Sequence, residues 1–91
     1  MTAVKIMHSK GRFYARTAHG EAELLYRKVG EGKISIFHTY VPEEERGRRI
    51  AEALARKAFD FANRSGLAVI PDCDYIKHFV LKHTELVKHT A

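Results

Sequence analysis

Apolar and polar side chains alternate along the first 41 residues, a pattern that indicates β-strands. Three turn-rich triplets interrupt the alternation: Ser9-Lys10-Gly11, Ala18-His19-Gly20 and Gly30-Glu31-Gly32. The segment therefore predicts an antiparallel meander of four strands. By alternation, the two faces of the fourth strand are expected to carry Ile34, Ile36, His38 and Tyr40 on one side and Ser35, Phe37, Thr39 and Val41 on the other. Bulky groups on both faces are typical of a central strand.

A helical period replaces the alternation after Pro42, which ends the fourth strand. From about Gly47 onward, one apolar stripe is formed by Ile50, Leu54, Ala58 and Phe61, and is widened by Ala51, Ala55 and Ala62. We expect this stripe to belong to the core. Gly66 suits the left-handed position after a helix, so the helix is predicted to end near Ser65.

A short strand and a second helix follow. The run from Leu67 to Ile70 is apolar throughout, which fits a strand buried on both faces, and Pro71 ends it. Strand, helix and strand in this order imply a parallel pair. Apolar residues then recur at helical spacing, at Tyr75, Ile76, Phe79 and Val80, and predict a helix of two to three turns before the tail 83–91. The predicted fold class is α+β, with a mixed sheet in one domain over residues 1–91.

Composition narrows the classes of protein that fit. A chain of 91 residues with 45% hydrophobic content suits one compact domain. No apolar run approaches the roughly 20 residues that span a bilayer, and the N-terminus lacks the apolar centre of a secretory signal. The single cysteine, Cys73, excludes an internal disulfide. We therefore expect a cytoplasmic protein without a membrane partner, whose net charge of +5 favours anionic partners.

Candidate chemistry concentrates between Thr39 and Leu54, where a strand runs into a basic turn with one glycine and then into a helix. The first backbone N–H groups of a helix have no partner within it and point toward the turn, so the geometry suits a phosphate or pyrophosphate. Arginines at 46, 48 and 49 would add charge-assisted hydrogen bonds. The alternative interpretation is a solvated helix start with no ligand.

This segment resembles the pyrophosphate-binding signature of the GNAT superfamily of acyl-CoA-dependent N-acyltransferases: Arg or Gln, two residues, Gly, one residue, Gly or Ala. Arg46 fills the first position and Ala51 the last, while Arg49 stands where the inner glycine is expected. The chain also resembles a compact subfamily of this superfamily in two further segments, His38-Thr39-Tyr40-Val41-Pro42 and Pro71-Asp72-Cys73-Asp74-Tyr75. Arg49 would either crowd the backbone approach to the pyrophosphate or reach the 3′-phosphate of the coenzyme.

The resemblance implies acetyl-CoA as the acyl donor. Its pantetheine arm would follow the fourth strand and its diphosphate would rest on the turn. The implied coenzyme-binding residues are Thr39, Tyr40, Val41, Arg46, Gly47, Arg48, Arg49, Ile50 and Ala51.

Three side chains are candidates for catalysis. His38 is a candidate general base, or a histidine that is hydrogen-bonded for structure. Cys73 is a candidate acyl acceptor at a helix start, or a small packed residue. Tyr75 is a candidate acid for the leaving thiolate, or a packed ring. Cys73, His78 and His83 are spaced by five residues, so they diverge around a helix and no metal site is expected.

The function that the sequence predicts is acetyl-CoA-dependent N-acetyl transfer to an amine on a small molecule or on a protein side chain. The alternatives are a non-catalytic acyl-CoA-binding module and a small basic nucleic-acid-binding protein, although no aromatic-rich RNA-binding motif is visible. Open edges of a small sheet make a homodimer plausible.

Overall fold

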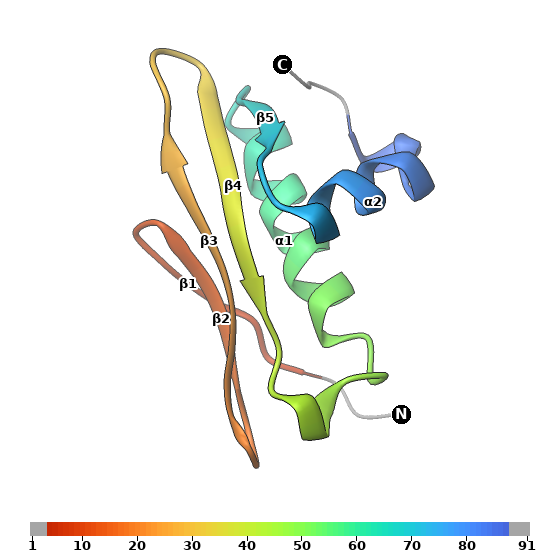
Figure 1. Ribbon diagram of the computed structural model, residues 1–91. Helices are drawn as coiled ribbons and strands as arrows, with labels where there is room; N and C mark the ends of the chain where they lie inside the picture. Colours follow the sequence, from red (N-terminus) through yellow and green to blue (C-terminus); the bar gives the residue numbers. More distant parts are fainter. Residues whose placement is uncertain (1–3, 88–91) are drawn as a thin grey trace.

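The computed structural model describes residues 4–87 as a five-stranded sheet with two α-helices (Figure 1). The strands are β1 (Met7–Ser9), β2 (Arg12–Thr17), β3 (Gly20–Lys28), β4 (Lys33–Tyr40) and β5 (Ala68–Pro71). The helices are α1 (Ile50–Arg64) and α2 (Asp74–Lys82), with short 3-10 turns at Glu43–Glu45 and Thr84–Leu86. The sheet order is β1-β2-β3-β4-β5, antiparallel through β4 and parallel between β4 and β5. The α+β class and the element order expected from the sequence are confirmed.

One layer of helices covers one face of the sheet. Helix α1 crosses this face, and α2 lies beside it on the same side (Figure 1). The predicted stripe points into the core, since Ile50, Leu54 and Ala58 are buried and Phe61 packs against the cluster. The two helices are joined through Phe59 and Phe79, whose rings stack with centroids 5.4 Å apart.

The two ends of α1 are set by backbone conformations that a helix does not allow. The helix begins at Ile50, later than the predicted Gly47, because Gly47 and Arg49 have positive φ angles of 87° and 63°. At the other end Gly66 has φ +69°, and the Leu67 N–H donates to the Ala62 carbonyl at 2.8 Å. The predicted glycine stop is therefore confirmed.

A β-bulge in β4 changes which side chains share a face. Leu25 of β3 pairs with His38 but Tyr26 pairs with Ile36, so β4 carries one extra residue, Phe37. The prediction that His38 shares a face with Ile36 is therefore wrong: Ile36 faces the core, while His38 shares the helix-free face with Leu25. Strict alternation failed because a bulge depends on the pairing of two strands, which one strand does not reveal.

The last strand is also less buried than its sequence indicates. Strand β5 lies at the edge of the sheet, and among its residues only Val69 is fully buried. The expectation of burial on both faces is wrong because, within residues 4–87, helices cover only one face of the sheet. Nothing in these residues pairs with the outer edge of β5 either. Within these residues, no helix is long and apolar enough to cross a membrane.

Candidate functional site

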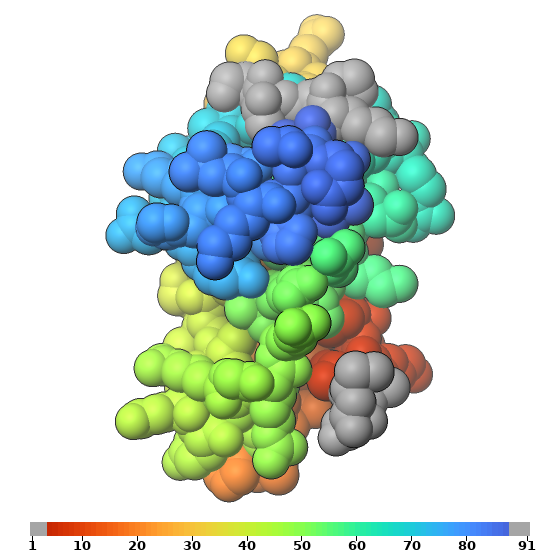
Figure 2. All heavy atoms as spheres, turned by 90° about the vertical axis from the view of Figure 1, so that its right-hand side faces the viewer, coloured from red at the N-terminus to blue at the C-terminus, as the bar shows by residue number. Residues whose placement is uncertain are grey.

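A groove of about 470 Å³ lies where the end of β4, the start of α1 and the start of α2 meet. Its walls are formed by Thr39, Tyr40, Val41, Glu45, Arg46, Gly47, Arg49, Ile50, Ala51, Glu52 and Tyr75. Figure 2 shows the face that these elements share, with α2 at one end, residues 43–50 at the other and α1 between them. The groove therefore joins the two segments that the sequence singles out.

The turn between β4 and α1 is held by short-range bonds. Pro42 begins a 3-10 turn in which the Glu45 N–H donates to the Pro42 carbonyl at 2.9 Å. The Arg46 side chain reaches back, and its Nε donates to the Val41 carbonyl at 3.2 Å. The turn is thus closed on the end of β4, which fixes how the following residues face the groove.

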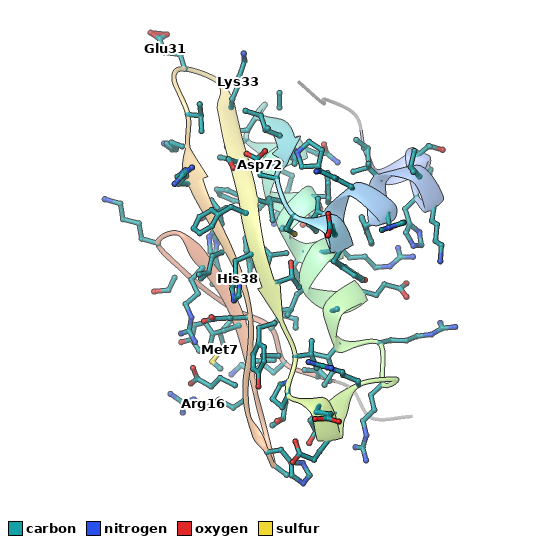
Figure 3. The ribbon with its side chains drawn as sticks, in the orientation of Figure 1. Met7, Arg16, Glu31, Lys33, His38 and Asp72 are labelled. Atoms are coloured by element: carbon teal, nitrogen blue, oxygen red, sulfur yellow. The ribbon has the colours of Figure 1, made fainter. Side chains whose placement is uncertain are left out.

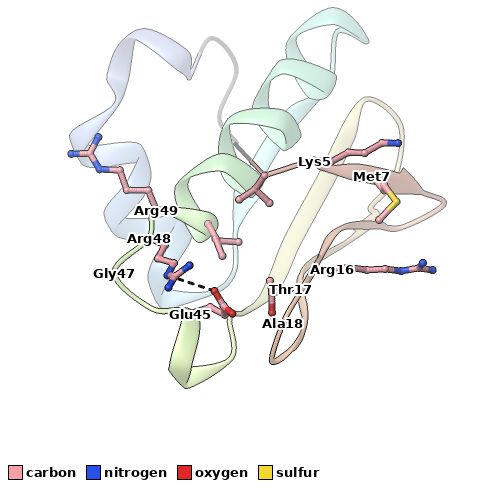
Figure 4. A pocket seen from close by; sticks show the side chains of 11 residues that line it. Lys5, Met7, Arg16, Thr17, Ala18, Glu45, Gly47, Arg48 and Arg49 are labelled. Atoms are coloured by element: carbon pink, nitrogen blue, oxygen red, sulfur yellow. Dashed lines mark ion pairs between the residues drawn. The ribbon is translucent and has the colours of Figure 1, made fainter. Parts of the chain in front are cut away.

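Glu45 attaches the turn to the β2–β3 hairpin. Its carboxylate is almost fully buried, and Oε2 lies 2.7 Å from Nδ1 of His19, on the hairpin turn. Its other oxygen lies 3.7 Å from Nε of Arg48 (Figure 4). A buried carboxylate that is partnered in this way ties segments together that are far apart in sequence.

The start of α1 presents groups that suit an anion. Its first backbone bond runs from the Ala53 N–H to the Arg49 carbonyl at 3.1 Å, so the amides of residues 50–52 precede it and have no partner within the helix. These amides, together with the positive end of the helix dipole, favour a phosphate. Arg46 and Arg49 line the same groove and add positive charge.

Two carboxylates in the groove were not foreseen from the sequence. Glu45 is paired with His19 and Arg48, and the Glu52 Oε2 accepts a hydrogen bond from Arg56 at 3.0 Å. That bond from Arg56 lowers the pKa of Glu52, with smaller contributions from the charges of Arg56, Arg49 and His83. Each acid has a cationic partner, so the groove still suits a polyanion. The position of Glu52 in the first turn of a helix was the available signal.

The edge of β4 next to β5 is only partly paired. The pairing ends at Ile36 with Pro71, after which the Asp72 N–H donates to the Ile36 carbonyl at 2.9 Å. Strand β4 continues to Tyr40, so the backbone of residues 37–40 has no β5 partner within the described chain. Oγ1 of Thr39 lies 3.5 Å from Sγ of Cys73, across this opening.

The structure brings most of the predicted site residues together, but not all of them. Tyr75 and the predicted coenzyme-binding residues other than Arg48 line the groove, and Cys73 adjoins it through Thr39. Arg48 lines a second hollow on the other side of the turn (Figure 4). His38 points to the helix-free face of the sheet, with Nε2 3.6 Å from the Glu23 carboxylate (Figure 3).

The pKa of the Tyr75 hydroxyl is shifted from its ordinary value. Burial raises the pKa of this phenol, and the nearby charge of Glu52 raises it further. Tyr75 therefore stays protonated around neutral pH and has a proton to donate inside the groove. In residues 4–87 no three His, Cys, Asp or Glu side chains gather in a way that would hold a metal ion.

The mixed sheet, the basic turn between β4 and α1, and the partial pairing of β4 with β5 are together typical of the small acyltransferase domains that the sequence resembles. The family model described as GCN5-related N-acetyl-transferase matches residues 12–89, so the chain belongs to the GCN5-related N-acetyltransferase family.

Individual relatives agree with this assignment. Protein NATD1 of Danio rerio is 41% identical over 83 residues, which cover 87% of this chain and 76% of the relative. Protein NATD1 of Homo sapiens is 37% identical over 81 residues, covering 85% and 72%. A GCN5-like protein from Staphylococcus aureus, solved by NMR, superposes with a TM-score of 0.76 at 27% identity and covers 94% of this chain and 86% of its own. The resemblance and the N-acetyltransferase function predicted from the sequence are confirmed.

Proposed function

We propose that the groove binds acetyl-CoA as the acyl donor. The observation that carries the proposal is the meeting of two features at one place: the unpaired β4 edge at residues 37–40 and the partner-free amides at residues 50–52. The diphosphate would accept hydrogen bonds from the backbone amides of residues 50–52 and from Arg46. The amide groups of the pantetheine arm would hydrogen-bond to the backbone of the β4 edge. The thioester would then lie by the opening where Thr39 meets Cys73.

In this arrangement the amine nitrogen attacks the thioester carbonyl, so that a C–N bond forms and the C–S bond breaks. Tyr75 would give its proton to the departing thiolate, and its position in the groove lining together with its protonated phenol supports this role. His38 lies on the helix-free face, and its imidazole would take the ammonium proton of an acceptor that arrives from that face. Two routes remain open for Cys73. In direct transfer Cys73 only packs beside the site, whereas in the other route its thiol accepts the acetyl group first and forms an acyl-cysteine intermediate.

Calorimetric titration tests the donor site. We expect acetyl-CoA to bind at a single site and ATP to bind at least tenfold more weakly, because ATP lacks the pantetheine arm that would use the β4 edge. Equal binding of both ligands, or no binding of acetyl-CoA, would contradict the donor assignment.

Turnover tests the catalytic roles. Release of free coenzyme thiol is followed with a panel of primary amines, including lysine peptides. We expect Tyr75→Phe and His38→Gln each to lower kcat by about 10²-fold or more, the size of a general acid or base contribution, with little change in coenzyme affinity. Leu81→Ala, on the exposed side of α2, is the matched control and should retain full kcat.

Mass spectrometry of the intact protein distinguishes the two routes for Cys73. Intact-protein mass after mixing with acetyl-CoA alone gains one acetyl group if Cys73 is the first acceptor, and Cys73→Ala abolishes both this gain and turnover. Unchanged mass together with near-normal turnover of Cys73→Ala establishes direct transfer. Coenzyme binding without turnover by any amine would instead indicate a non-catalytic binding module.

A further inference from the structure

Arg49 has a backbone conformation that is unfavourable for its residue type. Among residues 4–87 it is the one non-glycine residue with a positive φ, at φ 63° and ψ 26°. The left-handed region brings Cβ of an L-residue close to its own backbone, and glycine occupies this region without that penalty. The cost calls for a compensating role of the side chain.

The three arginines of the turn differ in what they bind. Arg46 donates to the Val41 carbonyl, and Arg48 faces the buried Glu45 carboxylate. Arg49 makes neither an ion pair nor a side-chain hydrogen bond within the described part of the chain. It is thus the arginine of the turn whose guanidinium donors stay available to a ligand.

The direction of the Arg49 side chain fits such a role. Figure 4 shows Arg48 turned toward Glu45, while the side chain of Arg49, which also lines the hollow drawn there, points away from that pair. Arg49 is exposed and lines the groove, on the side where its charge acts on the Glu52 carboxylate. Its guanidinium therefore lies at the rim of the groove, beyond the amides of residues 50–52.

We propose that Arg49 is a specificity-determining residue that binds the 3′-phosphate of the coenzyme and so selects it over donors that lack this group. The inference rests on the proposed acetyl-CoA groove. The helix amides and Arg46 would take the diphosphate, which leaves the phosphate monoester on the ribose as the remaining anion for a rim guanidinium. Arginine binds such a dianion with paired hydrogen bonds.

The test compares coenzyme A with 3′-dephospho-coenzyme A by calorimetry at fixed ionic strength. The wild-type protein should bind coenzyme A about tenfold to a hundredfold more tightly, the range of a charge-assisted hydrogen bond. In Arg49→Gly this ratio should fall to near one, because affinity for coenzyme A drops while affinity for the dephospho form is kept. Arg49→Ala removes the guanidinium but keeps the unfavourable backbone, and should lose the ratio as well.

Arg48→Ala is the matched control. It removes one positive charge from the neighbouring position without touching the groove rim, so the ratio should stay at the wild-type value. A wild-type ratio in Arg49→Gly, or an equal loss in Arg48→Ala, overturns the assignment to Arg49. Failure of both ligands to bind the wild-type protein would overturn the coenzyme groove itself, a result distinct from binding without discrimination.

Discussion

His8, in the short strand β1, contacts three aromatic side chains. Its ring stacks on Phe13 with centroids 4.0 Å apart, and Phe61 meets it edge-on at 4.8 Å. Nε2 of His8 lies 2.6 Å from the Tyr26 hydroxyl. His8 stays exposed, and partial desolvation beside these rings lowers its pKa below the ordinary value of 6.5. Side chains from β1, β2, β3 and α1 thus meet in one aromatic cluster.

His8 should make stability depend on pH below about 6.5. There the unfolded chain binds a proton before the folded protein does, so the free energy of unfolding falls as the pH falls and is fully retained above that value. We expect His8→Gln to lose this part of the pH dependence. Urea unfolding at several pH values between 5 and 8 measures it, and His78→Gln, exposed on α2, is the control. Parallel pH profiles for His8→Gln and wild type would contradict the assignment.

At the scale of elements, the turn between β4 and α1 depends on a contact that no local pattern reveals. Glu45 is one of three consecutive glutamates, and the sequence does not distinguish it from Glu44. In the structure Glu45 is buried against His19 while Glu44 is exposed. The turn before α1 is local in sequence, but Glu45 attaches it to the β2–β3 hairpin through His19.

Removal of the Glu45 carboxylate should therefore loosen the turn. We expect Glu45→Ala to lower the free energy of unfolding by about 1.5–3 kcal/mol, the range for a lost hydrogen bond to a charged group. Coenzyme affinity should weaken as well, because the amides of residues 50–52 lose their fixed orientation. Glu44→Ala is the matched control and should change stability by less than about 0.5 kcal/mol. Equal effects of the two substitutions, measured by urea unfolding and calorimetry, would show that Glu45 has no special role.

For the whole molecule, the two helices and the sheet share a single hydrophobic cluster. Phe59 of α1 is 1% exposed and stacks on Phe79 of α2, which also contacts His83 with ring centroids 4.5 Å apart. The cluster is small because the described chain covers only one face of its sheet with helices. A domain of this size has little stability to spare.

Truncation of this shared ring should affect the whole fold. We expect Phe59→Ala to lower the free energy of unfolding by about 3–5 kcal/mol through the cavity that it leaves. The unfolding transition followed by circular dichroism should remain single, since sheet and helices depend on the same cluster. Leu81→Ala, at a residue that is 76% exposed, should change stability by less than about 0.5 kcal/mol. Loss of the α2 signal ahead of the sheet signal would indicate that the helix unfolds separately.

The sequence by itself determined the α+β class, the order of the elements, the glycine end of α1 and the basic turn that leads from β4 into α1, because these follow from side-chain period and from local backbone preference. Only the tertiary structure decided which face His38 occupies, that β5 is an edge strand, and that Glu45, Glu52 and Tyr75 line one groove with the turn before α1. Bulges, edges and grooves arise when separate segments pair and pack, so their positions depend on contacts between residues that are far apart along the chain.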